Sequence, residues 1–449
     1  MQSQMLVDGQ LVDGQGCVCD IVNPATAQSA AVIGAADGAL LKRAQAAAIR
    51  AFERYSDTPV KERAARLERM AKRLQRHATE LAELESLNTG KPVGEALQHD
   101  VRLAIDAFRL CAQSLRSQGE RGACEGNDGC TWLIRQVAKG PVVVSAKWNY
   151  PLISVAYDLA AALAAGCSVI VKPSPQAPLS SLRLVQVIHD LAPPGMVNTV
   201  FGLSNRQQQR LDQALGLYST LGALAAAPDP VQRKAPAIVY ADTDVQTLID
   251  ALYASTFVNA GQDSALPGNL LVERELYSAV LKSLADVAVC LRTGDPADPN
   301  THLGPLISQA QQQAALDWLD RARQEAEVAT GGFVDEPAGF FLRPTVIGNP
   351  GNHPAADATR VFGPVISVTP FDVGEDPVAM ANVQCPAGAA SVWTRDVHRA
   401  MAVSKRLRHR CTWINHHGNY WQASRHATLT GAAHLIAGYQ HERHLVLSY

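Results

Sequence analysis

The stretch GPVVVSAKWNYPLISVAYDLAAALAAGCSVIVKPS, residues 140–174, decides the fold of this chain. It joins an apolar strand (140–145) to a helix of mostly small residues (152–165) and then to a second strand (168–172). A further helix and a third strand continue this alternation as far as Phe201. Strands and helices that alternate at such short intervals predict an α/β fold with a parallel, doubly wound sheet.

Polar and aromatic residues follow both of the quoted strands. Trp148–Pro151 come directly after the first strand, and Lys172–Ser174 come at the end of the second. In a doubly wound sheet, ligands bind in the crevice at the carboxyl ends of the strands. We therefore expect both groups of residues to face a site.

The composition is that of a soluble, multidomain enzyme, with 449 residues, of which 47% are hydrophobic and 18% charged. A net charge of -2 offers no footprint for nucleic acid or for an anionic membrane. The nine cysteines are scattered, and the first residues lack the pattern of a secretory signal, so we expect a reduced, cytoplasmic protein. Neither the cysteines nor the 13 histidines have a metal-ligand spacing, and we expect no metal.

The second half of the chain repeats the α/β texture. A strand is predicted at 238–240, followed by a helix that begins at 242–244 and ends near 259–262. The last residues, 443–449, have the composition of a strand. Because a lone edge strand needs a partner, we expect this strand to serve oligomerisation.

Nine segments together resemble the aldehyde dehydrogenase superfamily, and most of all the bacterial 4-aminobutyraldehyde dehydrogenases, which are betaine-aldehyde-like. Their order and spacing cover nearly the whole chain. They are VNPAT (22–26), NTGKP (88–92), WNYPL (148–152), ALAAGCSVIVKPS (162–174), NAGQD (259–263), LGPL (303–306), FGPV (362–365), VWTRD (392–396) and TWIN (412–415).

The resemblance implies three parts. A Rossmann-like domain of the coenzyme-binding type would comprise residues 1–115 and 135–240. A catalytic-type domain would comprise residues 241–424. A β-arm for oligomerisation would comprise residues 116–134 and 425–449.

In this family a thiolate attacks the aldehyde and a hydride passes to NAD(P). The chemistry needs a nucleophile, an oxyanion donor, a general base and a held nicotinamide. Asn149 matches the family's oxyanion donor, although a turn-capping asparagine is the alternative. Ser264 stands at the position of the family cysteine, and its alternative is an ordinary loop serine. Pro230 stands at the position of the glutamate base and cannot accept a proton.

The coenzyme site departs from the family in several places. Lys172 matches the lysine that binds the adenosine ribose, and Trp148 and Ser174 are the other vestiges of the site. Pro175 and Arg360 replace the two glutamates of the family pattern.

Two segments and one helix position also depart from the family. The segment 203–230 is too short to hold the whole helix that faces the pyrophosphate in the family, and the loop 423–431 is shortened. Asp158 replaces a helix lysine of the family. We therefore expect that this chain uses no coenzyme, with NAD(P) as the alternative if oxidation is retained.

The substrate end of the site is better preserved. Tyr150, Tyr157, Trp413 and Trp421 could supply aromatic faces for a cation, and Asp106 could supply an acidic contact. For each aromatic residue, core packing is the alternative.

Two histidines, His416 and His417, follow the last motif in the chain. They could line a pocket or reflect ordinary loop polarity.

Three functions follow from these observations. The first is an aldehyde-dehydrogenase-fold protein that has lost NAD-dependent oxidation, which would make it a pseudoenzyme. It would act as a regulatory partner, as a homo-oligomer (dimer or tetramer) or in co-assembly with an active relative. The second is an NAD(P)-dependent oxidoreductase for an aminoaldehyde such as 4-aminobutyraldehyde, with Ser264 at the nucleophile position. The third is a protein that binds or converts an aminoaldehyde or its cyclic imine without NAD.

Overall fold

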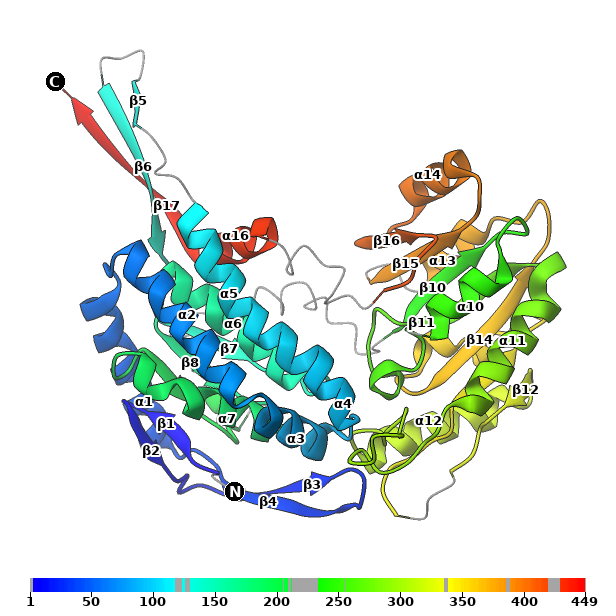
Figure 1. Ribbon diagram of the computed structural model, residues 1–449, viewed down its shortest axis with the longest axis horizontal. Helices are drawn as coiled ribbons and strands as arrows, with labels where there is room; N and C mark the ends of the chain where they lie inside the picture. The colour runs from blue at the N-terminus through cyan, green and yellow to red at the C-terminus, as the bar shows by residue number, and fades with distance from the viewer. Residues whose placement is uncertain are drawn as a thin grey trace.

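The computed structural model shows two α/β lobes and a projecting arm (Figure 1). It describes residues 3–117, 123–125, 130–204, 206–208, 211, 233–253, 255–334, 338–384, 388–418 and 429–448. Pro230, Trp421 and most of the segments 203–230 and 423–431 lie outside the described residues. No helix in the described part is both long and apolar enough to cross a membrane.

The first lobe contains the predicted parallel sheet. Strands β7 (Val142–Ser145), β8 (Val169–Lys172) and β9 (Val197–Thr199) pair in parallel, in the order in which they follow along the chain. The crossover helices are α6 (Pro151–Ala165) and α7 (Leu179–Ile188), as expected from the sequence. The expectation of an α/β fold is therefore confirmed.

Helix α6 is the central helix of this lobe. All of its residues are buried, which explains why its sequence consists of small and aliphatic side chains. It packs against α2 (Val60–Arg76) and α5 (Arg102–Ser117). It ends at Gly166, whose φ of 99° places it in the left-handed region that glycine adopts at a helix C-terminus.

The remaining elements of the first lobe surround this core. They are β1 (Met5–Val7), β2 (Gln10–Val12), β3 (Val18–Asn23), β4 (Gln28–Gly34), α1 (Gly38–Tyr55), α3 (Ala78–Thr89), α4 (Val93–Glu95), η1 (Ala96–Val101) and η2 (His189–Leu191).

The second lobe is built on a seven-stranded sheet in the order β12-β13-β14-β11-β10-β15-β16, of which only the edge strand β12 is antiparallel. The strands are β10 (Ala235–Val239), β11 (Pro267–Glu273), β12 (Glu327–Thr330), β13 (Thr345–Gly348), β14 (Val365–Phe371), β15 (Ala389–Trp393) and β16 (Cys411–Ile414). The helices are α10 (Val245–Tyr253), α11 (Tyr277–Cys290), α12 (Gln309–Ala322), α13 (Pro377–Gln384) and α14 (Val397–Arg406), with short helical turns η3 (Val258–Gly261), η4 (Arg274–Leu276), η5 (Pro354–Ala356) and η6 (Ala358–Arg360).

Side chains of β11 alternate between two cores, because successive residues of a strand point to opposite faces. Leu270 and Val272 pack in the core that includes residues of α10 and α11. Leu271 packs in the core that includes residues of α13 and α14. The sheet is therefore covered on both faces, as the parallel arrangement requires.

Two segments lie elsewhere than the sequence suggested. β10 pairs with β11 and β15, so it belongs to the sheet of the second lobe although the predicted domain boundary lay at residue 240. The helix predicted to run to 259–262 ends earlier, because α10 ends at Tyr253 and residues 258–261 form a separate turn.

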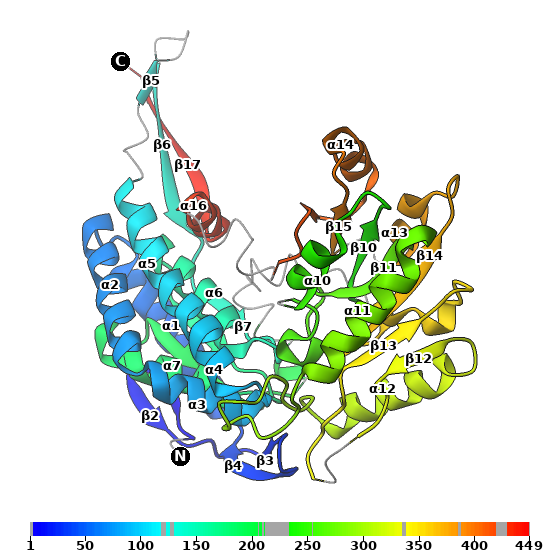
Figure 2. The same cartoon turned by 45° about the vertical axis from the view of Figure 1, so that its right-hand side comes forward.

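The arm consists of β17 (Gln440–Ser448), β6 (Cys130–Ala138) and β5 (Ala123–Glu125), and it projects from the first lobe (Figure 2). β17 is not a lone strand, since it pairs antiparallel with β6 over its whole length. α16 (Leu429–Gly438), which the sequence assigned to the arm, instead packs on α5 and α6. The chain thus returns to the first lobe before it enters the arm.

Tyr439 anchors this return. Its hydroxyl donates a hydrogen bond of 2.8 Å to the Asp158 carboxylate on α6, and both residues are buried. Asp158, the residue that replaces a family lysine, therefore has a structural partner in this chain.

We predict that Tyr439→Phe lowers the free energy of unfolding by about 1–3 kcal/mol, because the buried carboxylate loses a donor. Urea denaturation measures the change. Tyr253→Phe is the matched control, since Tyr253 is exposed, and a change of no more than about 0.5 kcal/mol is expected there. Equal effects of the two substitutions would contradict the anchoring role.

Candidate functional site

The two lobes are hydrogen-bonded to each other at Asn149. Its side-chain amide donates to the Gln262 carbonyl oxygen at 2.9 Å, and its own carbonyl oxygen accepts from the Asn259 amide at 2.9 Å. Asn149 follows β7 of the first lobe, whereas Asn259 and Gln262 belong to the loop that precedes β11 of the second. The structure thus brings the predicted oxyanion donor to the loop that carries Ser264.

This loop has an unusual backbone. Asn259, Ala260 and Gly261 have φ values of 52°, 53° and 70°, three successive residues in the left-handed region. Only glycine fits at the third position, because a Cβ there would lie 2.0 Å from the Gly363 carbonyl oxygen. Non-glycine residues in this region cost about 1–3 kcal/mol each, so the surrounding contacts must hold the loop.

Side chains on both lobes supply those contacts. The Glu95 carboxylate accepts from the backbone N–H of Asn259 at 3.1 Å. The Gln262 amide donates to the Asn259 carbonyl at 3.0 Å and its oxygen accepts from the N–H of Ile307 at 3.0 Å. Burial raises the pKa of Glu95 to about 7.

Ser264 is exposed, and a buried carboxylate precedes it in the chain. Asp263 accepts a hydrogen bond of 2.9 Å from the N–H of Ala265. Burial raises the pKa of Asp263, while the Tyr150 hydroxyl and the Lys147 ammonium, which face it, act in the opposite direction. The sequence analysis quoted Asp263 within the NAGQD motif but assigned no role to it or to Lys147, because a single charged residue forms no pattern that indicates one.

His417 is the histidine that lies near Ser264. Its Nε2 lies 2.7 Å from the Ala265 carbonyl oxygen, and its Nδ1 lies 2.8 Å from Ser391 Oγ. Its ring packs against Trp413, with 4.8 Å between the centroids. Because both ring nitrogens are engaged, His417 holds the loop and is not placed to act as a base for the serine.

The aromatic residues expected at the substrate end have different surroundings. Tyr150 is buried, and the Lys91 ammonium lies 4.3 Å from its ring centroid. Lys91 in turn forms an ion pair of 2.7 Å with Asp100. One face of the Tyr150 ring is thus occupied by a cation of the chain itself.

Trp413 is 8% exposed and belongs to the small core that includes Ala235 and Ala265. Its packing matches the alternative considered for the aromatic residues.

Tyr157 and Asp106 lie together on α6 and α5. Tyr157 is buried, and burial, with the nearby Asp106 carboxylate, raises the pKa of its hydroxyl. Asp106 also pairs with Arg109 at 3.3 Å and is partly exposed. The packing of Tyr157 in the core of the first lobe thus matches the alternative considered for the aromatic residues, whereas the Asp106 carboxylate remains partly exposed.

The residues expected to be vestiges of a coenzyme site lie at the carboxyl ends of β7 and β8. Trp148 packs edge-on against Phe362, with 6.1 Å between the centroids. Lys172 is half-buried and Ser174 is buried. Lysine and indole side chains are hydrogen-bond donors, so they can serve the oxygens of a nucleotide.

The acceptors for ribose hydroxyls are absent at the two positions that the resemblance indicates. Pro175 is exposed and has no polar side chain, and the exposed Arg360 lies 4.0 Å from the Asp357 carboxylate. An arginine only donates. At these two described positions, the residues do not fit the hydroxyl groups of NAD(P) in the manner of the family.

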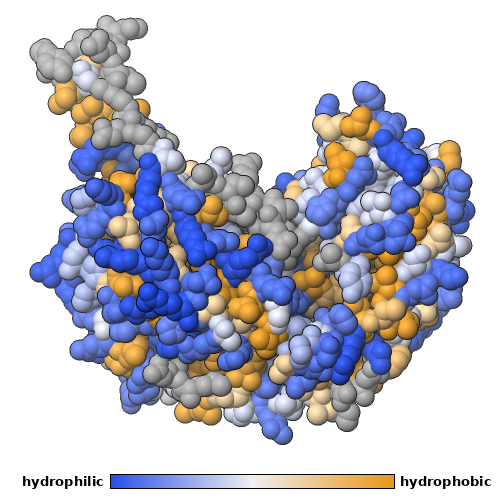
Figure 3. Space-filling view, in the orientation of Figure 1, coloured by the Kyte–Doolittle hydropathy of each residue, from blue (hydrophilic) through white to orange (hydrophobic). Residues whose placement is uncertain are grey.

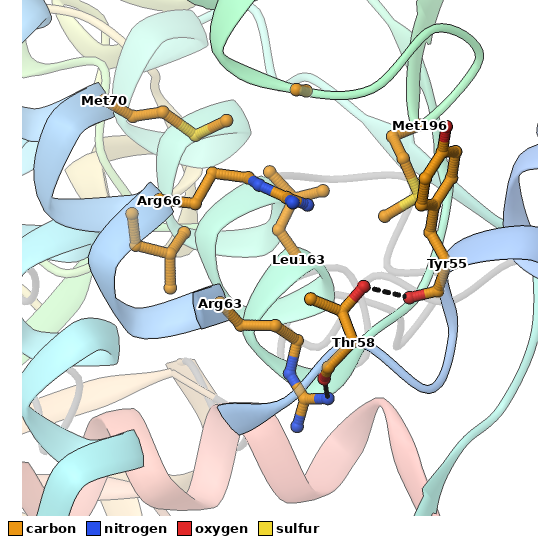
Figure 4. Close-up of a pocket in the computed structure, with 9 residues that line it drawn as sticks. Tyr55, Thr58, Arg63, Arg66, Met70, Leu163 and Met196 are labelled. Atoms are coloured by element: carbon orange, nitrogen blue, oxygen red, sulfur yellow. Dashed lines mark hydrogen bonds between the residues drawn. The ribbon is translucent and has the colours of Figure 1, made fainter. Parts of the chain in front are cut away.

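The molecular surface is hollowed between the two lobes (Figure 3). Elsewhere, a small cavity lies in the first lobe between α2 and α6, lined by Tyr55, Arg63, Met70, Leu163 and Met196 among others (Figure 4). Its volume of about 10 Å³ suffices for one water molecule at most. It is not the site described above.

The buried His417 predicts a pH effect on stability. Burial lowers its pKa to about 4, below the ordinary value of 6.5, so the unfolded chain binds a proton more readily than the folded one. The stabilisation is complete above pH 6.5 and is lost as the pH falls towards 4, by about 3 kcal/mol in total.

We expect the difference in unfolding free energy between wild type and His417→Gln to shrink by this amount between pH 7.5 and pH 4. Urea denaturation at several pH values measures it. His398→Gln, at an exposed position, should follow the wild-type curve throughout. Parallel curves for wild type and His417→Gln would contradict the prediction.

Comparison with known proteins places these features in a family. The model of the aldehyde dehydrogenase family matches residues 11–215 and 232–443. The unmatched stretch between them, 216–231, includes Pro230 and lies entirely outside the described residues.

Curated relatives and solved structures agree with this match. An aminoacetaldehyde dehydrogenase of Pseudomonas aeruginosa is 32% identical, with 88% of this chain and 83% of that protein covered. A betaine aldehyde dehydrogenase of Cereibacter sphaeroides is 32% identical, with 91% and 88% covered. The structure of PnpE from Pseudomonas sp. WBC-3 superimposes with a TM-score of 0.89 at 27% identity, covering 100% of this chain and 98% of that one. A structure of PnpE in complex with nicotinamide adenine dinucleotide superimposes with a TM-score of 0.88 at 27% identity and the same coverage.

Proposed function

Because the chain belongs to the aldehyde dehydrogenase family, we propose that it acts on an aldehyde bearing an amino or ammonium group, as an NAD(P)-dependent oxidoreductase. The observation that carries this proposal is the position of Asn149, whose amide meets the loop that leads to Ser264. The relatives described above are dehydrogenases, so family membership favours oxidation over the loss of activity that the sequence suggested.

The Asn149 side chain supports the carbonyl chemistry. An amide nitrogen has two N–H groups, and only one is needed for the bond to the Gln262 carbonyl. The second can donate to the oxygen of an aldehyde as negative charge develops there. A preorganised donor of this kind contributes about 10²–10³ to the rate.

Ser264 and Asp263 would supply the groups next to the carbonyl carbon. A serine hydroxyl attacks only when a base accepts its proton. The Asp263 carboxylate is the adjacent residue, and its raised pKa makes it a stronger proton acceptor than an ordinary aspartate.

The proposed substrate class is supported by the relatives and by Asp106. The partly exposed Asp106 carboxylate would attract a cation more than a neutral group. The names of the two relatives, aminoacetaldehyde and betaine aldehyde dehydrogenase, refer to aldehydes with a nitrogen centre.

NAD(P) would accept the hydride in such an oxidation. Solved structures of the family contain it, so the expectation that no coenzyme is used has no support from the comparisons. Lys172 and Trp148 are the donors available near the strand ends. Pro175 and Arg360 do not supply acceptors for the ribose hydroxyl groups, so the coenzyme would have to be held differently from the family pattern.

A second candidate is the scaffold without oxidation, which acts as a partner in an assembly. The arm supports it, because β17 lies at the edge of its sheet and carries exposed apolar side chains. These are Leu445, Val446 and Leu447, at 36%, 47% and 46% exposure. An exposed apolar edge strand favours pairing with a second copy or with a relative.

The experiment that separates the candidates uses 4-aminobutyraldehyde and, as an aldehyde that cannot cyclise, betaine aldehyde. NAD(P)H formation by the wild type, lost in Ser264→Ala and lowered about 10²–10³-fold in Asn149→Ala, is the result expected for the oxidoreductase. Spectrophotometry at the NAD(P)H absorption band measures it.

Thermal denaturation with the same aldehydes supplies the control. Stabilisation without NAD(P)H formation would favour the second candidate or a coenzyme-free reaction. Butanal, a neutral aldehyde, should stabilise the protein less than the cationic aldehydes, and Asp106→Asn should remove this preference. Neither turnover nor stabilisation with any aldehyde would overturn the proposed function.

A further inference from the structure

The segment 90–95 of the first lobe contacts the second lobe at three places. It comprises the end of the NTGKP motif and the short helix α4. At its start, Gly304 of the LGPL motif lies so close that a Cβ there would be 1.8 Å from the Gly90 carbonyl oxygen. In its middle, the N–H of Val93 donates to the Pro296 carbonyl oxygen at 3.0 Å. Two motifs that have no part in the chemistry proposed above thus meet at the junction of the lobes.

The third contact is made by Glu95, the last residue of the segment. Its carboxylate accepts from the backbone N–H of Asn259 at 3.1 Å. Asn259 is one of the residues with a left-handed backbone, with a φ of 52°. A carboxylate accepts from an N–H group more strongly than a neutral oxygen does, so Glu95 is suited to hold a strained residue in place.

An ion pair fixes the segment within the first lobe. Lys91 and Asp100, which lie on either side of Glu95 in the chain, are buried and pair at 2.7 Å. The buried Glu85 carboxylate, which faces both of them, accepts from the Ser180 hydroxyl. Asp100 and Glu85 are therefore bonded within the first lobe, whereas Glu95 is bonded to the second.

Asn259 connects Glu95 to the oxyanion donor. The Asn259 side-chain amide donates to the Asn149 carbonyl oxygen at 2.9 Å. The Asn149 side-chain amide in turn donates to the Gln262 carbonyl oxygen at 2.9 Å. A displacement of Asn259 would therefore break a bond to Asn149 and loosen the loop that leads to Ser264.

We propose that Glu95 is a positioning residue, which holds Asn259 and thereby fixes the Asn149 amide and the loop before Ser264. The proposal rests on the proposed function in one respect, namely that Asn149 donates to the oxygen of a bound aldehyde. The holding of the loop does not depend on any reaction. Because Glu95 acts through Asn259, its effect on the rate should pass through Asn149.

Hydrogen–deuterium exchange tests the holding of the loop without any substrate. Glu95→Ala removes the acceptor, so we expect a peptide that covers residues 257–266 to exchange about tenfold or more faster than in the wild type. Glu95→Gln keeps a carbonyl oxygen as acceptor and should lie between the two. Glu83→Ala is the matched control, since Glu83 is exposed on α3, and its loop should exchange as in the wild type.

A kinetic cycle with betaine aldehyde and NAD tests whether the effect passes through Asn149. We expect Glu95→Ala to lower kcat about tenfold and to leave KM unchanged, because the Asn149 amide serves charge that develops only in the transition state. Glu95→Gln should recover part of this loss. In the Asn149→Ala background, Glu95→Ala should lower kcat by less than about twofold more, because residues that act as one unit have non-additive effects.

The outcomes separate the two proposals. Loop exchange that is unchanged in Glu95→Ala overturns the positioning role, and so does faster exchange spread evenly over the protein. A further tenfold loss of kcat in the Asn149→Ala background also overturns it. If the wild type oxidises no aldehyde, the proposed function fails, while faster exchange confined to the loop still supports Glu95 as the residue that holds it.

The conservative variant keeps the test decisive if Glu95→Ala does not fold. The same comparisons are then made with Glu95→Gln, for which a smaller change in the same direction is expected. Exchange and kcat equal to those of the wild type in Glu95→Gln would then overturn the role of the carboxylate.

Discussion

The pair of hydrogen bonds between Asn149 and the 259–262 loop is the contact on which the site depends. Asn149 donates to Gln262 and accepts from Asn259, so one residue of the first lobe fixes two residues of the second. The loop holds Asn259 and Ala260 in the left-handed region, at about 1–3 kcal/mol each. Each hydrogen bond contributes about 0.5–1.5 kcal/mol, so several are needed to offset this strain. The bonds from Glu95 and Gln262 complete that set.

Charge burial is the second constraint at this junction. Asp158 on α6 and Asp263 in the loop before β11 are both buried, and hydrogen bonds stabilise their carboxylates there. A buried carboxylate that lost its donors would cost several kcal/mol, which explains why Tyr439 and the N–H of Ala265 are directed at these acids. The same burial raises the pKa of the Asp263 carboxylate. A carboxylate with a raised pKa is a stronger proton acceptor, which suits reactions at a carbonyl group.

Much of the fold could be predicted from the sequence, and specific parts could not. The β7-α6-β8 unit was predicted within a few residues, because its apolar strands, small-residue helix and Gly166 each act locally. The end of α10 was predicted wrongly, since the left-handed turn at Asn259–Gly261 depends on Gly363 and Glu95, which are distant in sequence. β17 looked like a lone strand because its partner β6 lies some 300 residues earlier, and only the fold brings them together. The predicted domain ranges differ from the structure at β10 and α16, while the partners and the roles of the site residues remain predictions.

The sequence by itself determined the family, the parallel α/β architecture and the replacement of the expected cysteine by Ser264, because motif order and strand–helix periodicity are properties of the linear chain. The tertiary structure decided what surrounds that serine. It bound the His417 ring to the Ala265 carbonyl oxygen and placed the Lys91 ammonium over the Tyr150 ring. These contacts depend on burial and on the approach of segments that are distant in the sequence, which no local pattern of residues records.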